Sequence, residues 1–211
     1  YYSFDHGDVH FVMLDDVHYL GRDAGNAEPT LRGRGNYEGR FGEAQLAWLA
    51  EDLARVPRDR MVVLAMHIPL VAHAAVDPKR QVADRDELLR ILDGRENVMA
   101  VAGHMHTTEH HYLDRNEGGG AEPPLHLHIL STVSGSWWSG PFDERGIPVT
   151  EQRDGTPNGY HVMAVDGNRL QLRYKAAGKP DDYQMRISLD TTFHQFGMDG
   201  LRDYRQGQLT G

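Results

Sequence analysis

The sequence predicts an α/β fold built on a parallel sheet. Apolar segments near residues 9–14, 61–69 and 98–106 lack polar alternation, which is typical of strands that are buried on both faces. Amphipathic helical segments separate these strands along the chain. Because the crossovers of such a sheet are right-handed, the carboxyl ends of its parallel strands are expected at one rim.

The first two predicted strands flank a turn at residues 5–8, and the second of them, 9–14, ends in two aspartates. A long loop is expected over residues 20–40, which are rich in Gly, Arg and Asn. Residues 42–55 carry a leucine stripe at helical spacing and are followed by Pro57. This pattern predicts the first helix.

The second predicted helix begins at Asp84 and ends before Gly94. Glu87 stands in the position that completes a capping box with Asp84. Leucines and an isoleucine at helical spacing give this segment an inward face, so we expect it to pack against the sheet.

The pattern changes after the third apolar strand. Alternating strands are expected at residues 110–114 and 125–131, on either side of a Gly-rich linker. From about residue 135 the chain reads as short strands and turns, and its last 20 residues carry weak patterning. We therefore predict two units, residues 1–134 and a small β-rich module over 135–211, whose last residues are either a tail or part of an incomplete module.

Composition limits the function classes. The net charge of −9, with no basic stripe, argues against binding to a nucleic-acid backbone. No window approaches the roughly 18 apolar residues of a membrane span. The chain has no cysteine, so a metal site would use imidazole, carboxylate or amide ligands. Phosphorylated substrates remain compatible with the negative charge, since a metal cluster supplies positive charge locally.

Histidines follow two of the predicted buried strands. His67 ends the second strand, and His104 and His106 end the third. In an extended segment, residues two apart point the same way, so His104 and His106 can converge on one centre or on two adjacent ions. An isolated histidine on a strand is usually structural, but three that share a rim indicate a metal site. His126 and His128 also alternate on one strand face, with nothing else expected to converge on them.

The segments around these histidines carry a family resemblance. AMHIP and AGHMH, in this order, resemble the last two motifs of calcineurin-like metallophosphoesterases. YYSFDHGDVHFVMLD and EAQLAWLAEDL resemble the elements that precede those motifs, and SGSWWSGP and DGTPNGY look like the C-terminal module of a bacterial subgroup. The resemblance covers residues 1 to about 190. It implies half of a four-layer αββα sandwich, the C-terminal lobe of the catalytic domain, followed by the β-rich module.

The resemblance also implies a chemistry. It places His67 and His104 on one metal ion and His106 on a second, in a two-metal centre that hydrolyses phosphate mono- or diesters. Mn, Fe, Zn, Ni and Co all accept imidazole and carboxylate ligands, so the ions are not identified. A periplasmic or extracellular location is suggested by the family alone.

The first three of the five family motifs are not convincingly present. Asp16-Val17-His18 imitates Asp-x-His, and residues 35–38 imitate the third motif with Tyr37 in place of its histidine. No Gly-Asp-x-x-Asp lies between them, so we expect both imitations to be rim-loop residues. The chain is therefore expected to be a C-terminal fragment, inactive alone, whose partner is the missing N-terminal half of the same protein.

No residue of the chain is assigned with confidence to the catalytic step. Six residues are weaker candidates for contacting a phosphate-ester substrate: Asp16, His18, Trp137, Trp138, Asn158 and Tyr160. The competing hypothesis is a non-catalytic binding module or a degenerate phosphoesterase-like lobe with a partner-binding role.

Overall fold

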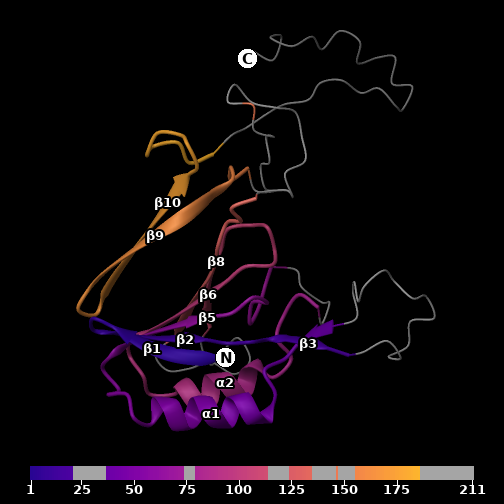
Figure 1. The fold of residues 1–211 in the computed structure, drawn as a ribbon, viewed down its shortest axis with the longest axis vertical. Helices are drawn as coiled ribbons and strands as arrows, with labels where there is room; N and C mark the ends of the chain where they lie inside the picture. Colours follow the sequence, from indigo (N-terminus) through magenta and orange to yellow (C-terminus); the bar gives the residue numbers. More distant parts are fainter. Residues whose placement is uncertain (21–36, 74–78, 114–123, 135–145, 147–154, 186–211) are drawn as a thin grey trace, which may run out of the picture.

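A computed structural model describes residues 1–20, 37–73, 79–113, 124–134, 146 and 155–185. Its centre is a six-stranded mixed sheet in the order β1-β2-β5-β6-β8-β7 (Figure 1). The strands are β1 (Tyr2–His6), β2 (Val9–Met13), β5 (Met61–Ala65), β6 (Val98–Ala102), β7 (Glu109–Leu113) and β8 (Leu125–Ile129). Strands β2, β5, β6 and β8 are parallel, whereas β1 and β7 pair antiparallel at the two edges. The predicted fold class is confirmed, with an antiparallel strand at each edge of the parallel core.

Two helices cover one face of the sheet, α1 (Glu43–Leu53) and α2 (Arg85–Leu92). Two small sheets complete the described structure. Strand β3 (Val17–Tyr19) pairs with β4 (Tyr37–Gly39), and β9 (Gly159–Asp166) pairs with β10 (Arg169–Ala176) as an antiparallel hairpin. The expectation of a continuous loop over residues 20–40 was wrong at its end, because residues 37–39 find a strand partner in β3.

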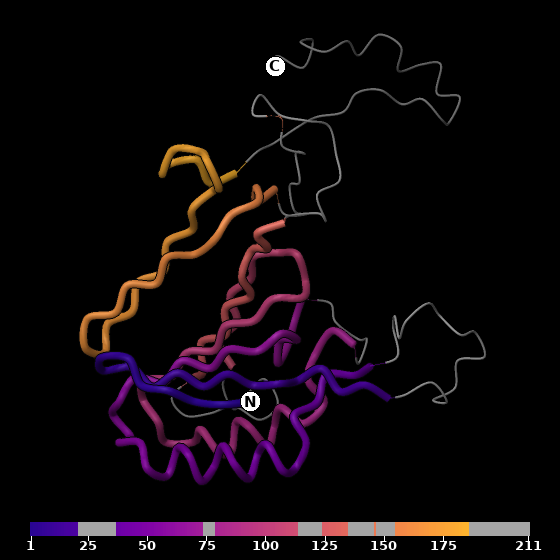
Figure 2. The backbone as a smooth tube through the Cα atoms, in the orientation of Figure 1, coloured from indigo at the N-terminus to yellow at the C-terminus, as the bar shows by residue number. Residues whose placement is uncertain are grey.

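Strand alternation divides the core into two layers. The larger layer lies between the sheet and the helices, where Val62 and Leu64 meet Leu49 and Leu88. The smaller layer lies on the opposite face, where Met61 and its neighbours meet the β9–β10 hairpin. Figure 2 shows the hairpin running over this face, away from the helices. The boundary predicted at residue 134 adjoins residues outside the described ranges, and it stays a prediction.

Asp84 does not complete the predicted capping box. It precedes α2, but its side chain makes no hydrogen bond to that helix. Its carboxylate instead accepts the backbone N–H groups of Phe41 (3.0 Å) and Gly42 (2.8 Å), just before α1. Gly42 has a φ of 82°, a left-handed conformation that glycine adopts without steric cost. The carboxylate therefore satisfies amides of the neighbouring helix start, and the two helices are joined at their N-termini.

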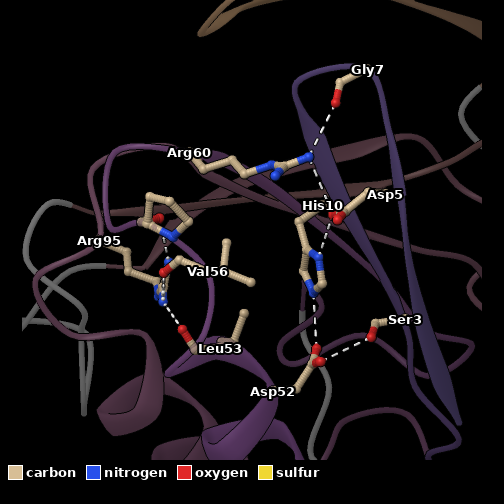
Figure 3. Close-up of polar contacts among 10 residues, drawn as sticks. Ser3, Asp5, Gly7, His10, Asp52, Leu53, Val56, Arg60 and Arg95 are labelled. Carbon is tan, nitrogen blue, oxygen red and sulfur yellow. Dashed lines mark hydrogen bonds and ion pairs between the residues drawn. The ribbon is translucent and has the colours of Figure 1, made fainter.

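The other end of α1 is capped by Arg95, which lies beyond α2 (Figure 3). Its guanidinium donates to the backbone carbonyl oxygens of Leu53, Val56 (3.0 Å) and Pro57 (3.1 Å). The last carbonyl groups of a helix have no partner within the helix, so this buried cation supplies one. Arg95 thereby fixes α1 against the turn that leads to β5.

A buried histidine ties the first two strands to α1. The His10 ring lies between the carboxylates of Asp5 (2.8 Å) and Asp52 (2.9 Å), and Ser3 donates to Asp52 (3.0 Å) (Figure 3). Arg60 donates to the carbonyl oxygen of Gly7 in the turn between the strands. Both ring nitrogens of His10 are thus occupied, and this histidine is a structural element of the fold.

Candidate metal centre at the carboxyl rim of the sheet

His67 lies just beyond the carboxyl end of β5, and its backbone is fixed by a buried aspartate. The Asp16 carboxylate accepts the N–H groups of His67 (3.1 Å) and Ile68 (2.9 Å). Asp16 is 1% exposed. Burial raises the pKa of Asp16 to about 6, in opposition to these two hydrogen bonds, which lower it. Asp16 therefore sets the direction in which the chain leaves β5.

His104 follows the neighbouring strand β6 and meets His67 at the rim. The Nδ1 atom of His104 lies 3.1 Å from Nε2 of His67, and the ring planes are inclined by 69°. On its other side, the Nε2 atom of His104 lies 2.8 Å from the carbonyl oxygen of Lys79. Since a carbonyl oxygen only accepts, Nε2 carries the hydrogen and Nδ1 presents a lone pair toward His67. The tautomer of His104 is thus suited to a ligand that binds at Nδ1.

The Gly-His-x-His segment is not extended. His104 and His106 both have left-handed backbones, with φ of 71° and 56°, and the Met105 N–H donates to the carbonyl oxygen of Gly103 (2.8 Å). The argument from an extended strand was therefore wrong for this segment, because β6 ends at Ala102. Positive φ is uncommon for residues other than glycine, and such strain is concentrated at functional sites.

His106 nevertheless lies within electrostatic range of the other two histidines. Burial lowers the pKa of His67 and of His104, and the charge of His106 lowers both further. The Tyr37 ring packs edge-on against His104, with centroids 6.1 Å apart. The environment therefore favours the neutral form of His67 and His104, which is the form that binds metal.

The donor set fits a transition metal in part. At Zn–N distances of about 2.0–2.1 Å, two ligands of a tetrahedral ion stand about 3.3 Å apart. The 3.1 Å separation of the His67 and His104 nitrogens is close to that value. Within the described ranges, no three or more His, Cys, Asp or Glu side chains are grouped closely enough to hold an ion. The rim therefore offers part of a coordination sphere.

The weaker candidates do not gather at this rim. Asp16 is buried beneath it, whereas His18 is exposed on β3. Asn158 is buried and Tyr160 is 48% exposed, and both belong to the start of the β9–β10 hairpin. Trp137 and Trp138 lie outside the described residues. In the imitation of the third motif, Glu38 pairs with Arg40 (2.6 Å).

Sequence reasoning missed Glu109, which joins the two rim loops. Its carboxylate accepts the His73 backbone N–H (2.9 Å), the Thr107 hydroxyl (2.6 Å) and the His111 Nε2–H (2.8 Å). His73 follows the His67 segment and Thr107 follows His106, so one side chain holds both. In the sequence, the one indication of this role is that Glu109 stands two residues after Thr107, close to the Gly-His-x-His segment.

The chain was compared with known proteins. Residues 128–200 match a family model described as the C terminal of Calcineurin-like phosphoesterase. No curated protein matches the sequence. None of the helices in the described part of the chain has both the length and the apolar character that crossing a bilayer requires.

Two solved structures resemble the chain. A dimetal phosphatase from Danio rerio superposes with a TM-score of 0.51 at 19% identity, over 83% of this chain and 57% of that one. The structure of PhoD gives a TM-score of 0.47 at 17% identity, over 83% of this chain and 42% of that one. The first likeness supports the fold assignment. The chain spans little more than half the length of the phosphatase that it resembles.

Proposed function

We propose that the chain forms part of a metal-dependent enzyme that hydrolyses phosphate mono- or diesters, because residues 128–200 match the C-terminal region of calcineurin-like phosphoesterases. The observation that carries this proposal is the His67–His104 pair. Two imidazole nitrogens meet at the rim, and the Lys79 carbonyl holds one ring in a ligating tautomer. The left-handed backbone of His104 and His106 also supports the proposal, because such strained conformations are concentrated at functional sites.

In this proposal, His67 and His104 hold one ion through Nε2 and Nδ1, and His106 holds a second. Mn, Fe, Zn, Ni and Co suit such a site. When bound, two such ions stabilise the charge that develops on a phosphoryl group during hydrolysis. The chain's own contribution is to keep His67 and His104 neutral and oriented. Burial favours the neutral rings, whereas Asp16 and the Lys79 carbonyl orient them.

The rim supplies too few ligands for two ions by itself. The family resemblance implies a carboxylate that bridges the ions, and the motifs that would provide one are not convincingly present in the sequence. We propose that an N-terminal half of the same protein contributes the other ligands and packs on the sheet. The exposed aromatic side chains of β1, Tyr2 at 58% and Phe4 at 45%, support a packing partner near that edge.

The test compares this chain with a longer protein. Residues 1–211, supplied with each of the five metals, should show negligible hydrolysis of p-nitrophenyl phosphate and of its bis-ester. A protein with the upstream segment should be active, and His67→Ala or His104→Ala in it should lower kcat/KM by at least about 100-fold. The matched control is His6→Ala, which removes an exposed histidine at the end of β1.

Two results would overturn the proposal. Turnover by residues 1–211 that is lost in His106→Ala would show that the chain holds a complete centre. A longer protein that contains Asp-x-His, Gly-Asp-x-x-Asp and Gly-Asn-His yet stays inert with every metal would favour a partner-binding lobe. The family resemblance also supports a periplasmic or extracellular location in a bacterium, which cell fractionation would test.

A further inference from the structure

A second group of histidines lies where the β9–β10 hairpin meets the sheet. His110 comes from β7, His126 and His128 from β8, and His161 from β9. The rings of His110 and His128 are stacked, with centroids 4.0 Å apart and planes inclined by 11°. His126 stacks on His110 at 5.2 Å, and His161 meets His128 edge-on at 4.8 Å. Three strands thus contribute to one cluster, which we call the histidine stack.

The geometry of the histidine stack does not suit a metal ion. Rings that lie face to face direct their nitrogen lone pairs in parallel planes, so the lone pairs do not meet at one point. Three of the nitrogens are also engaged, since His110 Nδ1 lies 3.0 Å from His126 Nε2 and His128 Nδ1 donates to the Glu109 carbonyl oxygen (3.0 Å). No three-ligand group occurs in the described part of the chain. The cluster is a contact between sheet and hairpin.

The surroundings of the stack hold few negative charges. From β7, Glu109 points its carboxylate toward His73, Thr107 and His111. The other titratable groups on the elements around the stack are His111 and Tyr112 of β7, Tyr160 and Asp166 of β9, and Arg169, Arg173, Tyr174 and Lys175 of β10, and β6 carries none. Asp166 lies at the far end of the hairpin, opposite Arg169. The electrostatic influences that act on the four imidazoles come from other histidines. Among the described residues, no carboxylate is hydrogen-bonded to the four rings, so a proton added to the stack gains no bonded counter-ion there.

His161 is also poorly placed to carry a positive charge while the hairpin is docked. Its Nδ1 atom is buried and has no hydrogen-bond partner among the described residues. A proton placed there would be buried without an acceptor, which costs free energy. In the released hairpin, the same ring would be hydrated and free to ionise.

We propose that the histidine stack is a pH-sensitive latch, which holds the start of the β9–β10 hairpin on the sheet while its imidazoles are neutral and releases it when they are protonated. Burial lowers the pKa of all four histidines, and that of His128 to about 4 from 6.5. A histidine whose pKa is lower in the docked state stabilises docking fully above pH 6.5. This stabilisation is lost as the pH falls from 6.5 toward 4, because the released state binds more protons in that window.

The far end of the hairpin has a different contact. There Met163, Val165 and Leu170 pack against Val9 and Met61, and these side chains do not titrate. Acidification should therefore act on the His161 end first. If docking caused the whole pKa shift of His128, the docking equilibrium would fall roughly 20-fold between pH 7 and pH 5, and this is the upper bound, because His110 and His126 of the sheet contribute to the shift as well. An undocked two-stranded hairpin is marginally stable, so its amides would lose protection.

The test measures hydrogen–deuterium exchange of residues 1–211 at pH 7 and pH 5, corrected for the intrinsic effect of pH on exchange. Peptides of β9 and β10 should lose at least tenfold in protection at pH 5, whereas peptides of β5 keep theirs. No step of phosphoester chemistry enters this inference, and the measurement needs neither metal nor substrate. Equal loss in β5 would indicate global unfolding and would overturn the latch, as would an unchanged hairpin.

Variants separate the stack from other acid-sensitive groups. In His128→Gln, the loss of hairpin protection between pH 7 and pH 5 should be less than a fifth of the loss in the parent, because glutamine does not ionise in this range. His161→Gln changes a less buried position and should reduce the loss of hairpin protection at least twofold. This variant tests the latch if His128→Gln does not fold. His6→Gln, at an exposed histidine of β1, is the matched control and should behave as the parent does. A loss of the same size in His161→Gln and in the parent would exclude the latch.

Discussion

The two histidine groups of this protein make two different kinds of contact with the same type of side chain. At the rim, His67 and His104 meet with their nitrogens 3.1 Å apart and their planes inclined by 69°. In the histidine stack, His110 and His128 lie face to face, with planes inclined by 11°. The first arrangement directs nitrogen atoms toward one place, and the second buries ring faces. Ring orientation therefore distinguishes a candidate ligand set from a packing contact, whereas the number of histidines does not.

Backbone conformation explains the difference. The stacked histidines occupy regular strand positions, and side chains of neighbouring strands stand side by side on one face. His104 and His106 leave the strand in left-handed conformations, which turn their rings out of that register. The strained backbone at the rim indicates a functional site, because such strain is concentrated at functional sites. The regular backbone of the histidine stack indicates a packing contact that stabilises the fold.

The largest expected effect concerns Asp16, which supports only the rim. Asp16→Ala removes the acceptor of two amides that are fixed at the end of β5, and we expect a loss of about 2–4 kcal/mol in the free energy of unfolding. Asp15→Ala, at the exposed neighbour, is the control and should cost less than about 0.5 kcal/mol. Urea unfolding measures both. Equal effects of the two variants would contradict the supporting role of Asp16.

A smaller effect is expected in metal binding. The chain should bind Zn²⁺ or Co²⁺ weakly, since its rim offers few ligands. His104→Ala should weaken this binding at least tenfold, or about 1.4 kcal/mol, whereas His126→Ala should change it less than about twofold, because the stack does not present converging nitrogens. Calorimetric titration of each variant gives the comparison. A similar weakening in both variants would mean that the stack also binds metal.

The smallest expected effect concerns Glu109, which contacts the rim loops through its carboxylate and the histidine stack through its backbone. Its carboxylate holds the rim loops, and its backbone carbonyl accepts the hydrogen of His128. Burial raises the pKa of Glu109, but hydrogen bonds from Thr107, His73 and His111 outweigh it, so the pKa lies below the ordinary 4.5. Glu109→Gln should cost about 1 kcal/mol at pH 7.

The pH dependence of this contribution follows from the sign of the shift. A lowered pKa stabilises the fold above pH 4.5, and the contribution disappears as the pH falls through the folded value. The variant and the parent should therefore converge in stability at low pH. The hairpin exchange of Glu109→Gln at pH 7 should match that of the parent, because the backbone carbonyl remains. Faster exchange would show that the two regions are coupled.

Much of the fold was predictable from residue pattern. Largely apolar runs indicated β2, β5 and β6, and the leucine stripe indicated α1. The meeting of His67 and His104 followed from topology, because neighbouring parallel strands end at the same rim. Local rules thus identified those parts that depend on one segment or on two adjacent strands.

The rest depends on contacts that no single segment encodes. The histidine stack requires β8 to lie between β6 and β7, and the hairpin to cross over them. Asp84 has an ordinary capping pattern for α2, yet the approach of α1 offers its carboxylate two other amides. The left-handed turn at His104 and His106 has only a weak signal in residue type, since histidine is enriched at positive φ but does not require it.

The carboxylate of Asp16 bonds to amides that are 51 and 52 residues further along the chain. Closing a loop of that length costs entropy before any contact compensates for it, so this contact should form late in folding. Strand β5 must first pair with β2, and only then does the segment after Ala65 come within reach of Asp16. We therefore expect the His67 and Ile68 amides to gain protection during refolding after those of Val62 and Leu64. In kinetic terms, we expect the Asp16 contact at the rim to form after β2 and β5 have paired. A segment that competes for the Asp16 carboxylate would then delay the His67–His104 pair without preventing the core from forming.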